Sequence, residues 1–460
     1  MRFLQRILLT LAVAGTTHQA AAFSLLGPLD PTFQTADIGY NPLNTDIGGP
    51  MNLGEGYRWN IRTIYYGFDP SFMHYFGAAG SNAVVQALRT YNALPPMSKV
   101  KNRLSRYSTD TRRVNYRALT LQIFDLKSYT LALMMEEMGL AAPERYVWTL
   151  RDKRPDGNET LYTVIRRNFD PVTQAPSSYV NDRLYTYAIQ DPIPINGGAS
   201  SYADAIELPV DPMDSFTSVA NAADSIYGSQ LLPGVFFTGL TRDDVGGLRY
   251  LYERKFANSY VENLVTNAVV SPIGNGGPWQ PVVIGTNGLT DTNNFIITAL
   301  RPGIDKFVFK IAPNTVFGNF IAFTNRNSDV FYNQNGRRSQ QAYLRTMVQP
   351  DIIFAAGDLG LSDGGNPITT RRSGNFVNNA ALNTSVGSGP AAGPGTITPT
   401  VVITFNKLGP FVQSETPSFL DQESAFVGWV WGSFDGTTND PVVYPVGSTI
   451  QDLQQIIFAP

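Results

Sequence analysis

The chain contains no cysteine and only two histidines, His18 and His74. Charged residues make up 15% of it, below the usual share of about a quarter. The 34 basic and 37 acidic residues nearly balance, which does not indicate a nucleic-acid-binding protein. Gly (41) and Pro (31) are abundant instead. This composition is typical of a β-rich extracellular protein with many turns.

The N-terminus has the pattern of a secretion signal. Arg2 and Arg6 flank the start of a short apolar run, Ile7 to Ala14, and small residues follow at Ala20 to Ala22. We expect cleavage after Ala22, which removes His18 and leaves His74 as the one imidazole. The apolar run is shorter than the roughly 20 residues of a membrane-spanning helix. Because secreted eukaryotic proteins usually carry disulfides, the lack of cysteine favours a bacterial protein that is secreted, periplasmic or on the cell surface.

Four zones divide the chain: a signal peptide (1–22), an extended arm rich in turn residues (23–56), a zone with helical patterns (57–256) and a zone of period-two alternation (257–460). In the third zone we expect helices over 80–94, with Ser81 as N-cap, and over 126–138, ended by Gly139. A third helix should begin at Thr241, where Asp244 completes a capping box.

The last zone predicts short β-strands. Val401, Ile403 and Phe405 alternate with other residues, as do Val427, Trp429 and Trp431, and Asn335-Gly336 predicts a hairpin turn. Such strands favour a β-sandwich. The Gly/Pro/Ala/Ser stretch at 387–395 is a long loop or a boundary between two small domains. The expected fold class is therefore α+β, followed by a β-sandwich region.

Two blocks of the third zone resemble the matrixin branch of the metzincin proteases. An aromatic strand, Ile64 to Phe68, leads to a long helix, and residues 240–252 (LTRDDVGGLRYLY) are similar to the closing helix of that family. The resemblance implies a metzincin-like domain over 57–256. Between these blocks the family carries three zinc-binding histidines and a general-base glutamate. Aligned on Gly139, this chain has Ala132, Glu136 and Ala142 at the ligand positions and Leu133 at the base position.

The resemblance therefore implies a protease scaffold without its zinc ligands, with Met213 as a weak counterpart of the family's methionine turn. The alternative is a hydrolase with a rebuilt carboxylate site around Glu136, Glu137 and His74, although the two glutamates are expected at the solvent edge of a helix. No cofactor is expected. A Ca²⁺ site from oxygen ligands is an open alternative, with two candidate acid clusters: Asp351, Asp358 and Asp363, and Asp435, Asn439 and Asp440.

The densest charge cluster is a basic run within residues 99–117. It consists of Lys99, Lys101, Arg103, Arg106, Arg112, Arg113 and Arg117, against one acid, Asp110. Such a run suits an acidic polysaccharide, lipid head groups or an acidic protein surface; the alternative is a solvated loop. We expect an exported, non-catalytic protein that binds a protein or glycan at the cell surface.

Overall fold

The computed structural model describes residues 22–27, 51–192, 194–195, 198–199, 203–220, 231–264, 269–272, 296–313, 320–333, 335–358, 370–377, 395–408, 412–413, 426–427 and 430–458. These residues form a mixed α+β structure with five α-helices and several sheets, some of them antiparallel. The expected α+β class is confirmed as a mixture of helices and sheets. None of the helices within these ranges is both long and apolar enough to cross a membrane.

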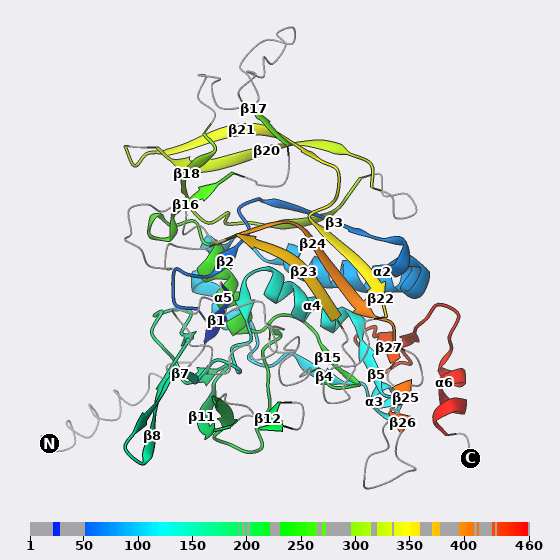
Figure 1. Cartoon of the computed structure of the whole chain (residues 1–460). Helices are drawn as coiled ribbons and strands as arrows, with labels where there is room; N and C mark the ends of the chain where they lie inside the picture. Colours follow the sequence, from blue (N-terminus) through cyan, green and yellow to red (C-terminus); the bar gives the residue numbers. More distant parts are fainter. Residues whose placement is uncertain are drawn as a thin grey trace, which may run out of the picture.

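A parallel sheet lies at the centre of the molecule (Figure 1). Its strand order is β19 (Val308–Ile311), β3 (Thr63–Phe68), β22 (Ile352–Gly357), β24 (Gly395–Asn406) and β2 (Tyr57–Arg58). β23 (Thr370–Val377) adds an antiparallel edge to β24. The structure differs here from the expected division at residue 256, because β3 pairs on one side with β19 and on the other with β22. Strands from both expected domains thus share one sheet and one core.

Two helices cover one face of this sheet. α2 (Pro70–Ala93) begins ten residues earlier than expected, because Asp69 caps it through the N–H of Phe72 and Pro70 occupies its first turn. It consists of two helical stretches joined by a kink at Gly77, where φ is 58°. Ser81 is therefore inside the helix and is not its cap. α4 (Leu126–Glu137) confirms the second expected helix, and Tyr91 of α2 donates a hydrogen bond to the carbonyl of Leu131 within it (2.6 Å).

An antiparallel sheet lies over the other face of the parallel sheet (Figure 1). Its order is β16 (Tyr260–Asn263), β18 (Thr298–Arg301), β20 (Phe323–Tyr332), β21 (Arg338–Met347) and β17 (Val269–Pro272). Tyr65 of β3 packs edge-on against Phe323, whereas its neighbour on the strand, Tyr66, faces the helices' side. The hairpin turn predicted at Asn335-Gly336 is confirmed between β20 and β21, with Gly336 at a φ of 67°.

The remaining C-terminal segments return to the helical side. β27 (Val430–Ser433) lies between β5 (Ile123–Asp125) and β28 (Val442–Val443), and Trp431 packs against Phe76 of α2 and Tyr129 of α4. Val401, Ile403 and Phe405 are buried as the alternation predicted; Trp429 lies outside the described residues. The other elements here are α3 (Tyr116–Thr120), α6 (Ile450–Ile457), β25 (Val412–Gln413) and β26 (Phe426–Val427).

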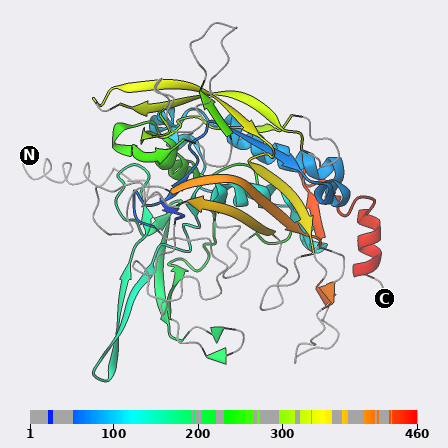
Figure 2. The ribbon, with the colours of Figure 1, turned by 45° about the horizontal axis from the view of Figure 1, so that its top comes forward.

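Smaller sheets and hairpins form the lower part of the molecule in the view of Figure 1. β1 (Phe23–Leu25), from the expected arm, lies between β6 (Leu140–Ala141) and β9 (Asn168–Phe169). The hairpin of β7 (Thr149–Asp156) and β8 (Glu159–Ile165) projects from the body (Figure 2). The other strands are β4 (Arg112–Val114), β10 (Tyr179–Val180), β11 (Arg183–Gln190), β12 (Pro194–Ile195), β13 (Gly198–Ala199), β14 (Asp204–Pro209) and β15 (Val235–Phe237).

The third expected helix is α5 (Arg242–Tyr252), which begins after Thr241 with the predicted capping box. Three short 3₁₀ helices complete the described elements: η1 (Met97–Lys99), η2 (Lys101–Arg106) and η4 (Phe256–Asn258). η1 and η2 carry the first part of the basic run, and both pack against α5. The basic run therefore lies next to the helix whose sequence resembles the matrixin closing helix.

Candidate functional site

The helix aligned with the zinc-binding helix of the resembled family is buried on all sides. In α4, every residue except Lys127 is buried, including Ala132 and Leu133. Gly139, just beyond it, has a φ of 95°, and a Cβ there would lie 2.0 Å from the carbonyl oxygen of Tyr57. The helix therefore ends against the chain near β2. It fills the space below the sheet and lines no open cleft within the described residues.

The two glutamates of α4 are not at a solvent edge, contrary to expectation. Glu136 is 9% exposed and Glu137 is 0% exposed. Burial raises the pKa of Glu137 to about 8, so its carboxyl group is largely protonated at neutral pH. At the same helix end, the backbone carbonyl of Glu137 accepts a hydrogen bond from the indole of buried Trp59 (2.7 Å).

The structure does not bring His74 to these glutamates. His74 is exposed on the first turns of α2. Gly80, further along α2, lies against Leu126 at the start of α4, whereas Glu136 and Glu137 end that helix. At 1.5 Å per residue they are roughly 15 Å beyond Leu126. Met213 is 88% exposed and lies under no site.

Neither expected acid cluster converges on a common point. Asp351 is buried in an ion pair with Arg345, Asp358 lies 3.7 Å from Lys407, and Asp363 is outside the described residues. Asp435 accepts hydrogen bonds from Thr437 and Asn439 within one turn, while Asp440 pairs with Arg117. In the part of the chain that the structure describes, no group of three or more His, Cys, Asp or Glu side chains could hold a metal ion.

Acidic residues of the closing-helix block have structural partners. Asp243 accepts the backbone N–H groups of Ala22 (2.7 Å) and Asn181 (2.6 Å). Asp244 accepts the N–H and the hydroxyl of Thr241 and the hydroxyl of Ser218. Both carboxylates are buried, and burial raises the pKa of Asp243 well above its usual value. In the uncleaved chain the block thus fastens three distant segments to the first turn of α5, and the predicted cleavage after Ala22 removes the first of them.

The glycines of the same block permit close packing. A Cβ on Gly246 would lie 2.5 Å from the side chain of Pro171. A Cβ on Gly247 would lie 2.8 Å from Leu140 and 2.9 Å from Phe23. At the end of α5, Tyr252 donates to the carbonyl of Met138 (2.7 Å). Helix α5 is therefore pressed against β1, β6 and the end of α4.

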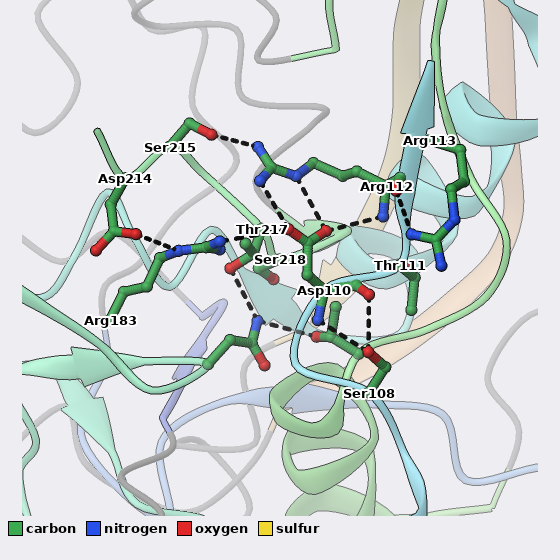
Figure 3. Close-up of polar contacts among 12 residues, drawn as sticks. Ser108, Asp110, Thr111, Arg112, Arg113, Arg183, Asp214, Ser215, Thr217 and Ser218 are labelled. Atoms are coloured by element: carbon green, nitrogen blue, oxygen red, sulfur yellow. Dashed lines mark hydrogen bonds and ion pairs between the residues drawn. The ribbon is translucent and has the colours of Figure 1, made fainter. Parts of the chain in front are cut away.

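The middle of the basic run belongs to a polar network, here called the Asp110 cluster: Asp110, Arg112, Arg183, Asp214 and Ser215 (Figure 3). Arg112 holds Asp110 through two N–H groups, at 2.8 and 3.1 Å, and donates to the hydroxyl of Ser215 (2.6 Å). Arg183 bridges Asp110 (3.3 Å) and Asp214 (2.9 Å). The charge of Arg112 is thereby neutralised within the protein.

The cluster shifts the pKa values of its members. Burial alone would raise the pKa of Asp110, but the hydrogen bonds from Arg112 and Arg183 outweigh burial and lower it. Burial acts to lower the pKa of Arg183, and its bonds to Asp214 and Asp110 raise it instead. Sequence reasoning missed Arg183, Asp214 and Ser215, because nothing local joins them to residue 110. The one available signal was Asp110, the single acid within the basic run.

The outer members of the basic run remain at the surface. Lys99, Arg103, Arg106 and Arg113 are exposed, and no ion pair joins them to a carboxylate among the described residues. Arg117 makes a solvent-exposed pair with Asp440 (3.2 Å), which contributes little. The side chain of Lys101 lies outside the described residues. The structure thus separates the predicted binding residues into one partly buried, ion-paired arginine, Arg112, and a set that is more exposed to solvent.

The chain matches no protein-family model, no curated protein and no solved structure.

Proposed function

We propose that this chain is an exported, non-catalytic binding protein built on a matrixin-like scaffold without zinc ligands. Its binding surface is the solvent-exposed part of the basic run, and its partner is the acidic surface of a polysaccharide or protein outside the cell. The observation that carries the proposal is the exposure of Lys99, Arg103, Arg106 and Arg113 without carboxylate partners in the described residues. A cluster of exposed positive charges attracts polyanions.

The surroundings of α4 support the non-catalytic part. The positions aligned with the family's zinc ligands hold Ala132, Glu136 and Ala142, and all three are buried. The alternative site would need Glu136, Glu137 and His74 together, but the helices hold them apart. The buried carboxylates of the closing-helix block accept backbone and hydroxyl hydrogen bonds, which is a structural use.

The test compares two triple variants of equal charge change. Lys99→Gln, Arg103→Gln and Arg106→Gln together should weaken binding to a sulfated polysaccharide, used as a polyanion probe, by about tenfold, at up to about 1 kcal/mol for each exposed contact. The control combines Arg154→Gln, Arg326→Gln and Arg337→Gln, three exposed arginines outside the run. Its affinity should stay close to that of the unmodified protein, and binding of all proteins should fall at high salt.

Equal losses in both triple variants would show binding to diffuse surface charge and contradict the proposed surface. Tightly bound stoichiometric zinc together with peptide cleavage would contradict the non-catalytic assignment. For a hydrolase of the alternative kind, Glu136→Ala and Glu137→Ala would each abolish that cleavage.

A further inference from the structure

A small pocket that is open to solvent lies between the segment after α5 and the antiparallel sheet. Its wall includes Asn60 and Arg62 before β3, Arg254 after α5, Arg301 of β18 and Asp329 of β20. Three of these five side chains are arginines, and one is an acid. None of them belongs to the basic run, so the pocket is a separate feature of the protein.

Arg301 and Asp329 neutralise each other and form a fixed wall. The guanidinium of Arg301 holds the carboxylate through Nε and Nη2, each at 2.9 Å. Its remaining N–H groups donate to backbone carbonyls, including that of Ile297 (2.8 Å). Both side chains are buried. The carboxylate of Asp329 is therefore already paired with Arg301, and it does not neutralise the other two arginines of the pocket.

Arg62 and Arg254 have no such partner. Each donates one long hydrogen bond to the same acceptor, the carbonyl of Ile304, at 3.4 and 3.5 Å. Among the described residues, neither forms an ion pair with a carboxylate. The Nε of Arg254 is buried and lacks a hydrogen-bond partner in that part of the chain, although a buried donor without an acceptor costs about 1–3 kcal/mol. The pocket thus holds two guanidinium groups, the exposed one of Arg62 and the half-buried one of Arg254, and neither is paired with a carboxylate of the described residues.

The neighbouring charges do not cancel this excess. Burial lowers the pKa of Arg254, and the charges of Arg62 and Arg338 lower it further, while Asp305 acts in the opposite direction. The carboxylate of Asp305 is itself bound to the backbone N–H (2.8 Å) and the hydroxyl (3.2 Å) of Ser98. Two guanidinium groups held beside each other in a hollow are an arrangement that an anion would stabilise.

We propose that this pocket binds a tetrahedral oxyanion, a phosphate or sulfate group, between the guanidinium groups of Arg62 and Arg254. A tetrahedral ion offers oxygens to donors arriving from different elements, as these two arginines do. The hydroxyl of Ser328, on the pocket wall, accepts from Gln340 and keeps its own proton to donate. The group is either a free ion or an ester on a small sugar. The inference does not depend on the proposed function.

The experiment is calorimetric titration of the full mature protein with four separate probes: inorganic phosphate, inorganic sulfate, glucose 6-phosphate and glucose 6-sulfate, in chloride buffer of matched ionic strength. We expect one site per chain for at least one probe. Binding of the inorganic ions identifies a free-ion site, and binding of the esters alone identifies an ester site. Arg254→Gln should weaken the binding of that probe by about tenfold or more, because a charge-assisted hydrogen bond from a buried donor is lost.

Arg62→Gln is the second variant, to be used if Arg254→Gln does not fold. Because Arg62 is exposed, this substitution leaves the core intact. Arg326→Gln is the matched control, an exposed arginine of β20 outside the pocket wall, and should bind as the unmodified protein does. Absence of binding for all four probes would overturn the proposal. So would affinities unchanged in Arg62→Gln and Arg254→Gln, or an equal loss in Arg326→Gln.

Discussion

The glutamates of α4 are the residues whose burial the local sequence predicted least well. Glu136 and Glu137 were expected at the solvent because glutamate is seldom fully buried. The residues before them, Leu131 to Met135, are apolar on all sides of the helix, and such a helix is usually buried all round. That pattern was the available signal. It places Glu137 in the core, where burial raises the pKa of its carboxyl group to about 8.

Replacing Glu137 should change how stability depends on pH. Between the ordinary glutamate pKa of 4.5 and about 8, the folded protein retains a proton on Glu137 that the unfolded chain releases. This group's contribution is therefore fully present below pH 4.5 and is lost as pH rises towards 8, by up to about 1.4 kcal/mol per pH unit. Glu137→Gln cannot ionise, so urea unfolding from pH 4.5 to 9 should show its stability rising relative to the unmodified protein.

The exposed Glu159→Gln in the β7–β8 hairpin is the control. Its stability should follow that of the unmodified protein at every pH. Parallel curves for Glu137→Gln and the unmodified protein would contradict the raised pKa.

At the scale of single elements, sequence signals worked where they were local. The capping box of α5, the glycine after α4 and the Asn335-Gly336 turn each lie within a few residues of the feature that they predict. The start of α2 was missed because Ser81 was taken as the cap, whereas Asp69 caps the helix and Pro70 occupies its first turn. The closing-helix block predicted α5, but its distant partners could not be read from it.

Two capping boxes lie within the described part of the chain; their surroundings differ, and this difference can be measured. Asp452 of α6 accepts only from Thr449 and is in an exposed box. Asp244 of α5 accepts from Thr241 and also from Ser218 and the backbone of Val219 (3.2 Å), all buried. Asp452→Ala should cost about 1 kcal/mol, because it removes the N3 member of an exposed capping box whose N-cap is Thr449. Asp244→Ala should cost at least about 3 kcal/mol, since buried donors lose their acceptor.

Urea unfolding at pH 7 gives both free energies. Equal costs for the two substitutions would show that Asp244 serves only its capping box and does not fasten residues 218–220 to α5.

At the scale of the whole molecule, the sequence could not show which strands meet. Period-two alternation identified strands after residue 257, and an aromatic run identified β3, but parallel pairing leaves no local trace in either strand. β3 lies between β19 and β22, which come from far along the chain. The predicted separation into an N-terminal domain and a β-sandwich followed from composition, which changes near residue 256 although the sheet and core continue across it.

A chain ending at residue 256 should therefore fail to fold alone. It would lose both neighbours of β3, and buried Arg58 would lose its partner Glu262, 2.7 Å away. Leaving one member of a buried ion pair uncompensated costs about 3–5 kcal/mol, a large part of the stability of an ordinary domain. We expect residues 23–256 to show no cooperative unfolding transition by circular dichroism and to be digested rapidly by protease. Adding residues 257–460 as a second chain should restore protection, because the shared sheet can then form. A cooperative transition for 23–256 alone would contradict the shared core and support two independent domains.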